Sequence, residues 1–145
     1  MEETALKLKC EIVTPEGLVY DDSVAMVIVP GELGELGVLP RHEPLVTLTK
    51  VGEVRIRSAA EDGEWEQLAV GGGYVKVQFD RLLMLVATAE RADDIDVERA
   101  RTALERADGW LAMGGEEGVD VRRAEQSRLR ALNRLKVAGK DQDSL

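Results

Sequence analysis

Residues 75–111 read VKVQFDRLLMLVATAERADDIDVERARTALERADGWL, and the hydrophobic period changes inside this stretch. Up to Thr88, apolar residues alternate with polar ones or form one short run, which is typical of β-strands. After Glu90, apolar residues recur at steps of three and four, as on one face of an amphipathic helix; they are Val97, Ala100, Leu104, Ala107 and Leu111. The chain is therefore predicted to have a strand-rich domain, residues 1–90, followed by a helical domain, residues 91–145.

Short strands and turns follow one another through the first domain. Apolar and charged residues alternate over 6–12, and an apolar run over 24–29 stops at Pro30. Residues 46–49 and 54–57 flank a four-residue link that contains a glycine, which predicts a β-hairpin. Eight or more short strands at this spacing indicate an antiparallel sandwich or barrel.

Two helices are predicted in the second domain, at about 95–112 and 120–138, and the glycine-rich segment Gly114–Gly118 separates them. Asp94 or Asp96 can cap the start of the first helix. Both apolar seams are rich in alanine, which buries little area per residue. The helices are therefore expected to form an antiparallel hairpin that is weakly anchored and able to change its docking.

The charge of the chain is negative overall but unevenly distributed. The 145 residues carry a net charge of −9, which argues against a nucleic-acid partner. Residues 121–140, however, hold seven basic residues and a single acidic one, Glu125. The second helix is thus either a solvated basic face or a surface for an acidic partner. The short acidic tail, residues 141–145, is assigned no role.

The sequence gives no sign of membrane insertion, export or an internal disulfide. No apolar run approaches the roughly 18 residues of a membrane-spanning helix. The first residues, Met1–Thr4, lack the basic head of a signal peptide. Cys10 is the only cysteine, so it has no partner within the chain.

No catalytic constellation is found in the sequence. His42 is the only histidine, so a zinc site cannot be completed, and no serine lies in a G-x-S-x-G pattern. Gly31, Gly34 and Gly37 lack the lysine and hydroxyl residue of a phosphate-binding loop, and Gly71–Gly73 indicates a bulge or a close backbone approach. We expect a protein that is not an enzyme, without a metal or a covalently bound cofactor.

One long motif carries a resemblance to a known family. Residues 30–45, PGELGELGVLPRHEPL, together with residues 51–56, VGEVRI, closely resemble the epsilon subunits of bacterial F-type ATP synthases. The similarity runs from Leu8 to Lys136 and keeps the order of the two domains. It implies an N-terminal β-sandwich and a C-terminal helical hairpin.

The resemblance also implies a function. In this family the sandwich docks on the gamma subunit and on the membrane c-ring, and it turns with the central stalk. The subunit thereby couples proton translocation to ATP synthesis, and its helices inhibit ATP hydrolysis by reaching the alpha/beta catalytic head. A peripheral location on the cytoplasmic face of the bacterial cell membrane follows. Within this chain the loop 31–45 is expected to form a docking edge, through Gly31, Gly34, Arg41 and His42.

A second motif implies that ATP is a regulatory ligand. Residues 95–100, IDVERA, fit the I/L-D-x-x-R-A pattern with which some bacterial epsilon subunits bind ATP. The resemblance assigns eight residues to this site: Glu90, Ile95, Asp96, Arg99, Ala100, Arg106, Arg130 and Arg134. Helix geometry agrees, because Arg99 and Arg106 lie two turns apart on nearly one face and the last two arginines are i,i+4 neighbours. Guanidinium groups suit phosphate oxygens.

Other interpretations of the same residues remain open. The arginines can instead pair with acids, as Arg101 can with Glu98 or Glu105, and such exposed pairs need no function. The chain could also be a stand-alone nucleotide-sensing protein that works without gamma. A small β-sandwich enzyme is the third interpretation, and the missing catalytic constellation counts against it.

Overall fold

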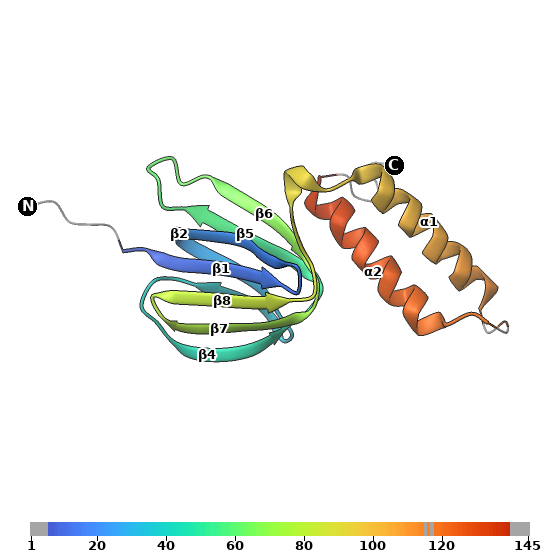
Figure 1. Ribbon diagram of the computed structural model, residues 1–145, viewed down its shortest axis with the longest axis horizontal. Helices are drawn as coiled ribbons and strands as arrows, with labels where there is room; N and C mark the ends of the chain where they lie inside the picture. The colour runs from blue at the N-terminus through green and yellow to red at the C-terminus, as the bar shows by residue number, and fades with distance from the viewer. Residues whose placement is uncertain (1–5, 115, 117, 140–145) are drawn as a thin grey trace, which may run out of the picture. The chain divides into compact units, whose positions relative to one another are not determined.

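The structure, a computed structural model, describes residues 6–114, 116 and 118–139. It divides into two compact units, Met1–Arg91 and Ala92–Leu145, the first built of strands and the second of helices (Figure 1). The acidic tail and part of the glycine-rich break between the helices lie outside the described residues.

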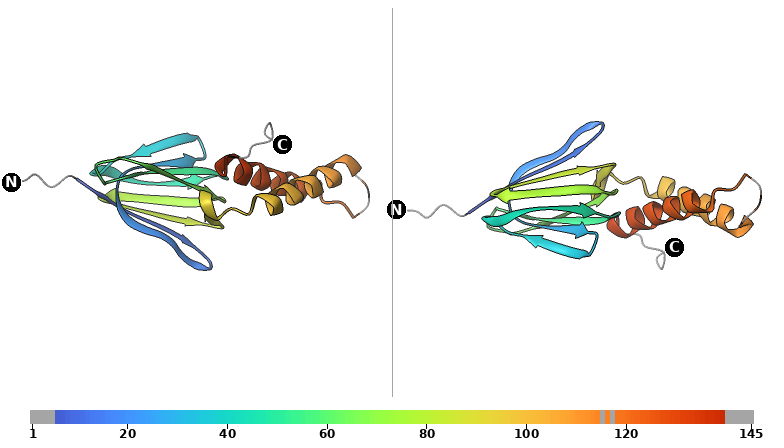
Figure 2. Two further views of the ribbon diagram at one scale, coloured as in Figure 1. Left: turned by 90° about the horizontal axis from the view of Figure 1, so that it is seen from above. Right: turned by 90° about the horizontal axis from the view of Figure 1, so that it is seen from below.

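Nine strands are described in the first unit. They are β1 (Leu8–Thr14), β2 (Gly17–Gly31), β3 (Gly34–Val38), β4 (His42–Thr49), β5 (Gly52–Ser58), β6 (Trp65–Val70), β7 (Gly73–Phe79), β8 (Arg81–Val86) and β9 (Ala89–Arg91). Strands β1, β8, β7 and β4 form one layer, while β2, β5, β6 and β9 form the other, with β3 beside β2 (Figure 2). The predicted β-sandwich is confirmed. One pairing, β1 with β8, is parallel.

Strand β2 joins the two layers because it is long and changes partners along its length. Its first half pairs with β1, and its second half lies between β3 and β5. It continues through Pro30, where the sequence predicted a stop. Proline is tolerated there because β5 pairs only as far as Ile28, and the Pro30 carbonyl still accepts the Lys50 amide at 3.0 Å.

The predicted hairpin between residues 46–49 and 54–57 is wrong. Strand β4 pairs with β7, whereas β5 pairs with β2 and β6. The link between β4 and β5 wraps the end of β2, since a Cβ on Gly52 would lie 2.7 Å from the Pro30 Cβ. A short link that contains a glycine permits either a hairpin or such a crossing. The turn signal therefore did not determine which strand pairs with β4.

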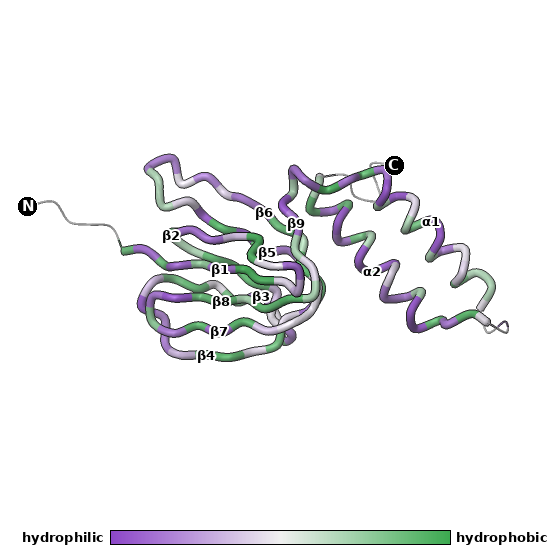
Figure 3. Tube along the Cα trace, in the orientation of Figure 1, coloured by the Kyte–Doolittle hydropathy of each residue, from purple (hydrophilic) through white to green (hydrophobic). Residues whose placement is uncertain are grey.

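The sandwich core is aliphatic, in keeping with an aromatic content of only 3% of the residues. Its largest fully buried side chains are Leu8, Ile12, Ile56, Leu68, Leu82 and Met84, and Tyr20 is the one aromatic ring in this cluster as described. Apolar and polar residues alternate along several strands (Figure 3), because successive side chains face the core and the solvent in turn. The predicted close approach at the triple glycine is confirmed, because a Cβ on Gly73 would clash with the Leu85 carbonyl oxygen.

The second unit contains a 3₁₀ turn, Ala92–Asp94, and two helices, α1 (Val97–Met113) and α2 (Val121–Val137), which form an antiparallel hairpin (Figure 1). Asp96 caps α1 by accepting the Arg99 amide, and Asp120 caps α2 by accepting the Arg123 amide. The helix bounds lie within two residues of the predicted ones. None of the helices in the described part of the chain is long and apolar enough to cross a membrane.

Candidate functional site

The helical hairpin is held by a small core. Ala100 and Leu104 of α1 pack with Ala131 and Leu135 of α2, and these side chains are almost fully buried. Because two of the four are alanines, the helices can approach closely but bury little apolar area. The expectation of a weakly anchored hairpin agrees with this small cluster.

One ion pair between the helices shows which side of α1 and which side of α2 lie on the same face of the hairpin. Asp108 of α1 and Arg128 of α2 are 2.8 Å apart. At roughly 100° per residue, Asp108 lies on one side of the buried seam of α1, while Arg99 and Arg106 lie on the other side. Arg128 likewise lies towards one side of the α2 seam.

The four predicted arginines therefore share one face of the hairpin. On the same helical wheel, Arg130 and Arg134 lie on the side of the α2 seam away from Arg128. Since Asp108 and Arg128 meet on one face, the four arginines occupy the opposite face, and we name them the arginine flank: Arg99, Arg106, Arg130 and Arg134. The opposite face is mixed in charge and includes an ion pair between Glu98 and Arg101 at 2.7 Å.

The arginine flank is open to solvent for most of its length. Arg99, Arg106 and Arg130 are exposed, and Arg134 is half-buried. The Arg130 guanidinium donates to the Ser127 hydroxyl at 3.2 Å. Among the described residues, Arg99 and Arg106 form no ion pair. The simple pairing interpretation thus holds for Arg101, whereas these two guanidinium groups are available to an anion.

The other predicted ligand residues differ in their surroundings. Asp96 is exposed and uses one carboxylate oxygen as the helix cap, which leaves its second oxygen able to accept. Ile95 is 8% exposed, and Ala100 is buried in the hairpin core. Ala100 is therefore a spacer between the helices in this structure. Glu90 lies on β9, in the first unit, and is half-buried.

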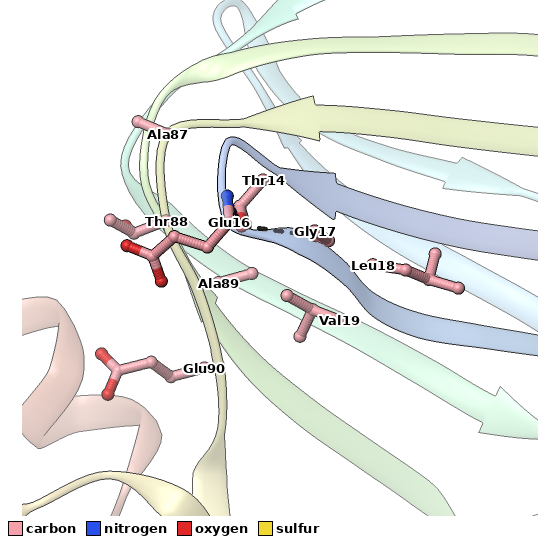
Figure 4. Close-up of a pocket in the computed structure, with 9 residues that line it drawn as sticks. All are labelled: Thr14, Glu16, Gly17, Leu18, Val19, Ala87, Thr88, Ala89 and Glu90. Atoms are coloured by element: carbon pink, nitrogen blue, oxygen red, sulfur yellow. Dashed lines mark hydrogen bonds between the residues drawn. The ribbon is translucent and has the colours of Figure 1, made fainter.

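A hollow of about 430 Å³ in the sandwich is partly acidic (Figure 4). Thr14, Glu16, Thr88 and Glu90 are among the residues that line it. Carboxylates repel phosphate, so this hollow does not have the chemistry of a phosphate site. No group of three potential metal ligands is found among the described residues.

The predicted docking residues do not form one edge. Gly31 pairs with Gly34 in the β2–β3 hairpin and with Thr49 at the end of β4, whereas His42 pairs with Phe79 at the start of β4. The two groups thus lie at opposite ends of an eight-residue strand. The segment 31–45 is also not a loop, because it contains all of β3 and the start of β4.

The glycines and the Arg41–His42 pair have local structural roles as well. A Cβ on Gly31 would lie 2.7 Å from the Gly34 carbonyl oxygen, and Gly34 has a φ of 139°. Arg41 has a φ of 66°, and its amide donates to the Asp80 carboxylate at 2.8 Å. The His42 ring nitrogen Nδ1 lies 2.7 Å from the Glu43 carbonyl oxygen.

An exposed apolar surface was missed by the sequence reasoning. We name it the β4 patch: Leu33, Val46, Leu48 and Tyr74, which surround a depression of about 550 Å³. Leu33 is 102% exposed and Val46 is 64% exposed, while Thr49 of the same strand is buried. Over residues 46–49 of β4 the threonines are the less exposed residues and the larger apolar ones face outward, which inverts the usual pattern, whereas Leu45 packs against the core. The alternation of apolar residues with threonines over 46–49 is visible in the sequence, but it does not say which side of the strand faces solvent.

The fold and the site together define a two-part protein: a strand sandwich with an apolar face and a helical hairpin with a cationic one. Two family models match the chain. The beta-sandwich domain of the ATP synthase delta/epsilon chain matches residues 7–92, and the long alpha-helix domain of the same chain matches residues 93–139. The chain belongs to the ATP synthase delta/epsilon family. The resemblance inferred from the sequence, including the class of a non-catalytic subunit, is confirmed.

Curated relatives agree over nearly the full length. The ATP synthase epsilon chain of Desulforamulus reducens is 46% identical over 130 residues, covering 90% of this chain and 96% of that one. The epsilon chain of Halalkalibacterium halodurans is 47% identical over 133 residues, covering 92% and 98%. Both relatives are bacterial proteins.

Two solved structures share the fold. A chain in the OSCP/F1/c-ring structure of the Euglena gracilis mitochondrial ATP synthase has a TM-score of 0.67 at 20% identity, covering 96% of this chain and 81% of that one. A chain in the central stalk/c-ring structure of the Tetrahymena thermophila mitochondrial ATP synthase has a TM-score of 0.57 at 15% identity, covering 91% and 96%. At these identities the likeness shows the fold alone.

Proposed function

We propose that this chain is a central-stalk subunit of a bacterial F-type ATP synthase. It turns with the gamma subunit and the c-ring, couples proton translocation to ATP synthesis, and performs no chemistry itself. Its location is peripheral, on the cytoplasmic face of the cell membrane. Family membership and the solved stalk complexes that share its fold support this assignment.

The β4 patch is the surface that supports a protein partner in the stalk. Large apolar side chains that face solvent together mark a protein-interaction surface more often than scattered ones do. The depression between Leu33, Leu48 and Tyr74 can receive an apolar side chain of the partner. We assign this patch to the gamma subunit, and the charged strand ends near Arg41 remain available for other contacts.

The helical hairpin inhibits ATP hydrolysis when it leaves its folded state and reaches the alpha/beta head. Its small core makes unfolding of the hairpin inexpensive, and the basic residues of α2 then meet acidic surface on the head. Such a contact weakens as salt rises.

ATP holds the hairpin in its folded, non-inhibitory state. The single observation that carries this proposal is the arginine flank, on which Arg99 and Arg106, which pair with no acid among the described residues, share one face with Arg130 and Arg134. Phosphate oxygens accept from guanidinium groups, and the second Asp96 oxygen can accept from the adenine amino group. ATP shifts the population only as far as it prefers the folded hairpin.

Calorimetric titration of the full chain with ATP, and with GTP in parallel, tests the nucleotide proposal. Arg99→Ala removes a residue of the arginine flank, whereas Arg101→Ala removes an arginine two positions away on the opposite face. We expect saturable ATP binding in the unmodified chain and in Arg101→Ala, and none in Arg99→Ala or with GTP. Absence of binding at millimolar ATP would refute the sensor proposal and leave the stalk assignment intact.

Two experiments on the assembled enzyme test the stalk assignment and the inhibition. Co-purification with gamma separates a stalk subunit from a stand-alone nucleotide sensor. Val46→Asp in the β4 patch should abolish it, while Leu18→Asp, at a position that is 55% exposed, should not. Deletion of residues 120–145 should raise ATP hydrolysis by the reconstituted catalytic head, and unchanged hydrolysis would contradict the inhibitory role.

A further inference from the structure

Arg91, the last residue of β9, contacts two strands other than its own. Its Nη1 lies 2.6 Å from the Oε2 of Glu66 on β6. Its guanidinium carbon lies 4.9 Å from the centroid of the Tyr20 ring on β2. One side chain at the end of the sandwich therefore joins three strands.

Strand β9 needs such a contact because its backbone pairing is short. It has three residues, and it pairs with β6 from Leu68 to Val70 and with no second strand among those described. Just before it, the Gly71 amide donates to the Thr88 carbonyl at 2.9 Å. A short edge strand with one set of hydrogen bonds opens readily when no side chain holds it.

The surroundings of Arg91 are built to hold it in place. Alternation puts Ala89 and Arg91 on the same face of β9, and Ala89 packs against the sandwich core. Tyr20 belongs to that core and is only 7% exposed, so its ring is a fixed platform for the guanidinium. Glu66 lies two residues before Leu68, the pairing partner of Arg91, and is therefore its diagonal neighbour on the same face.

We propose that Arg91 is a positioning residue that anchors the root of the helical hairpin. By holding β9 on the sandwich, it keeps Glu90 in place and confines the hinge before α1 to residues 92–96. Without this anchor, β9 detaches and the hinge extends back to residue 89, because residues 87 and 88 keep their own backbone hydrogen bonds to Gly72 and Gly71. Its maximum reach then grows from roughly 17 Å to roughly 28 Å, at about 3.5 Å per residue.

The anchor can be released because it is only partly shielded from water. The side chains of Arg91 and Glu66 are 40% and 41% exposed. An ion pair at this exposure is screened by salt and exchanges with water-bound states. The ring contact of Arg91 supplements it, so neither contact alone locks the strand.

Hydrogen exchange of the full chain, followed by mass spectrometry, tests the anchor without any ligand. Arg91→Ala removes both contacts, whereas Glu66→Gln abolishes the ion pair, leaves a neutral amide oxygen as acceptor, and keeps the ring contact. The matched control is Arg81→Ala, which removes another sandwich arginine that is 73% exposed and pairs with Glu11 at 3.6 Å. We expect about tenfold faster exchange of the peptide spanning residues 87–92 in Arg91→Ala. A smaller increase is expected in Glu66→Gln, and none in the control.

The result that would overturn the anchor is exchange in Arg91→Ala that matches the control at residues 87–92. If Arg91→Ala fails to fold, as judged by far-ultraviolet circular dichroism, Glu66→Gln takes its place. Unchanged exchange in that variant then overturns the proposal. Faster exchange confined to β9 and its partner β6 supports it.

A second readout rests on the proposed nucleotide site, to which the family resemblance assigns Glu90. We expect Arg91→Ala to weaken ATP binding by the full chain about tenfold, relative to Arg81→Ala. Arg91→Lys, which keeps the charge but loses the planar group over Tyr20, should lie between them. If Arg91→Ala exchanges faster but binds ATP with unchanged affinity, the proposal that Arg91 positions Glu90 for ATP is overturned. Failure of the unmodified chain to bind ATP would refute the site and leave the exchange test of the anchor intact.

Discussion

The carboxylate of Asp108 on α1 lies 2.8 Å from Nε of Arg128 on α2, and this ion pair crosses the hairpin on the face opposite the arginine flank. It aligns the two helices along their length, because it joins a side chain of one helix directly to a side chain of the other. Since α1 and α2 run antiparallel, it also sets Arg106 level with Arg130. The pair therefore contributes to the arrangement of the flank without belonging to it.

Asp108→Asn should destabilise the hairpin only slightly. The two side chains are 48% and 38% exposed, so solvent screens the pair, and we expect a loss of about 0.5 kcal/mol. A double-mutant cycle with Arg128→Gln, read by urea denaturation of the helical signal, measures the coupling. A coupling energy above about 2 kcal/mol would show that the pair is a major support of the hairpin.

Leu135→Ala should unfold the hairpin and leave the sandwich folded. Leu135 is 0% exposed in a cluster of only four buried residues, and truncation of a buried leucine costs about 2–5 kcal/mol. We expect a loss of circular dichroism at 222 nm and unchanged nuclear magnetic resonance signals from the sandwich. Leu129→Ala, at a position that is 54% exposed, is the control and should change neither signal.

Much of the fold was predictable because local periodicity determined it. The change of period after Glu90 separated strands from helices, and the carboxylate of Asp96 marked the start of α1. The pairing of β4 was not predictable from the turn signal, since a short link that contains Gly52 is compatible with either partner. The observed crossing brings Gly52 against Pro30, a tertiary contact that the local sequence does not specify.

The candidate site was predictable in part for the same reason. Helical spacing put Arg99 and Arg106 on one face, and the spacing of Arg130 and Arg134 did the same for the second helix. That both pairs share a face of the hairpin depends on the register between helices, which the Asp108–Arg128 pair reports. The outward-facing Val46 was missed because inward and outward alternation looks alike until the neighbouring sheet is known.

Phe79→Gly should stabilise the sandwich. Phe79 ends β7, where the chain turns into β8, with a φ of 59°, a conformation that disfavours side chains with a Cβ, and the residue is 58% exposed. Relief of this strain outweighs the added freedom of glycine in the unfolded chain, and we expect a gain of about 0.5–1 kcal/mol in urea denaturation. Phe79→Ala keeps the positive φ and is the control. A glycine variant less stable than the alanine variant would contradict the strain.

The buried thiol of Cys10 should become a source of instability at alkaline pH. Burial, followed by the charges of Glu11, Asp21 and Asp22, raises the pKa of Cys10 from 9.0 to about 12. The folded state therefore favours the neutral thiol, while the unfolded chain releases the proton near pH 9. The contribution of the protonated Cys10 thiol to the free energy of unfolding is fully present below pH 9. It is lost as pH rises from 9 towards 12.

Denaturation of the unmodified chain and of Cys10→Ala between pH 8 and 11 measures this effect. Each proton released only on unfolding lowers the free energy of unfolding by up to roughly 1.4 kcal/mol per pH unit. Burial, followed by the charge of Glu66, raises the pKa of Tyr20 to about 12, and Tyr20 adds its own loss above pH 10 in both proteins. Because Cys10 also contributes to that shift, the slopes of the two proteins are compared between pH 9 and 10. The alanine variant starts less stable because of its smaller side chain, yet its free energy should fall less steeply above pH 9. Parallel pH profiles for the two proteins would mean that unfolding does not change the protonation of the Cys10 thiol. Its burial would then have no consequence for alkaline stability.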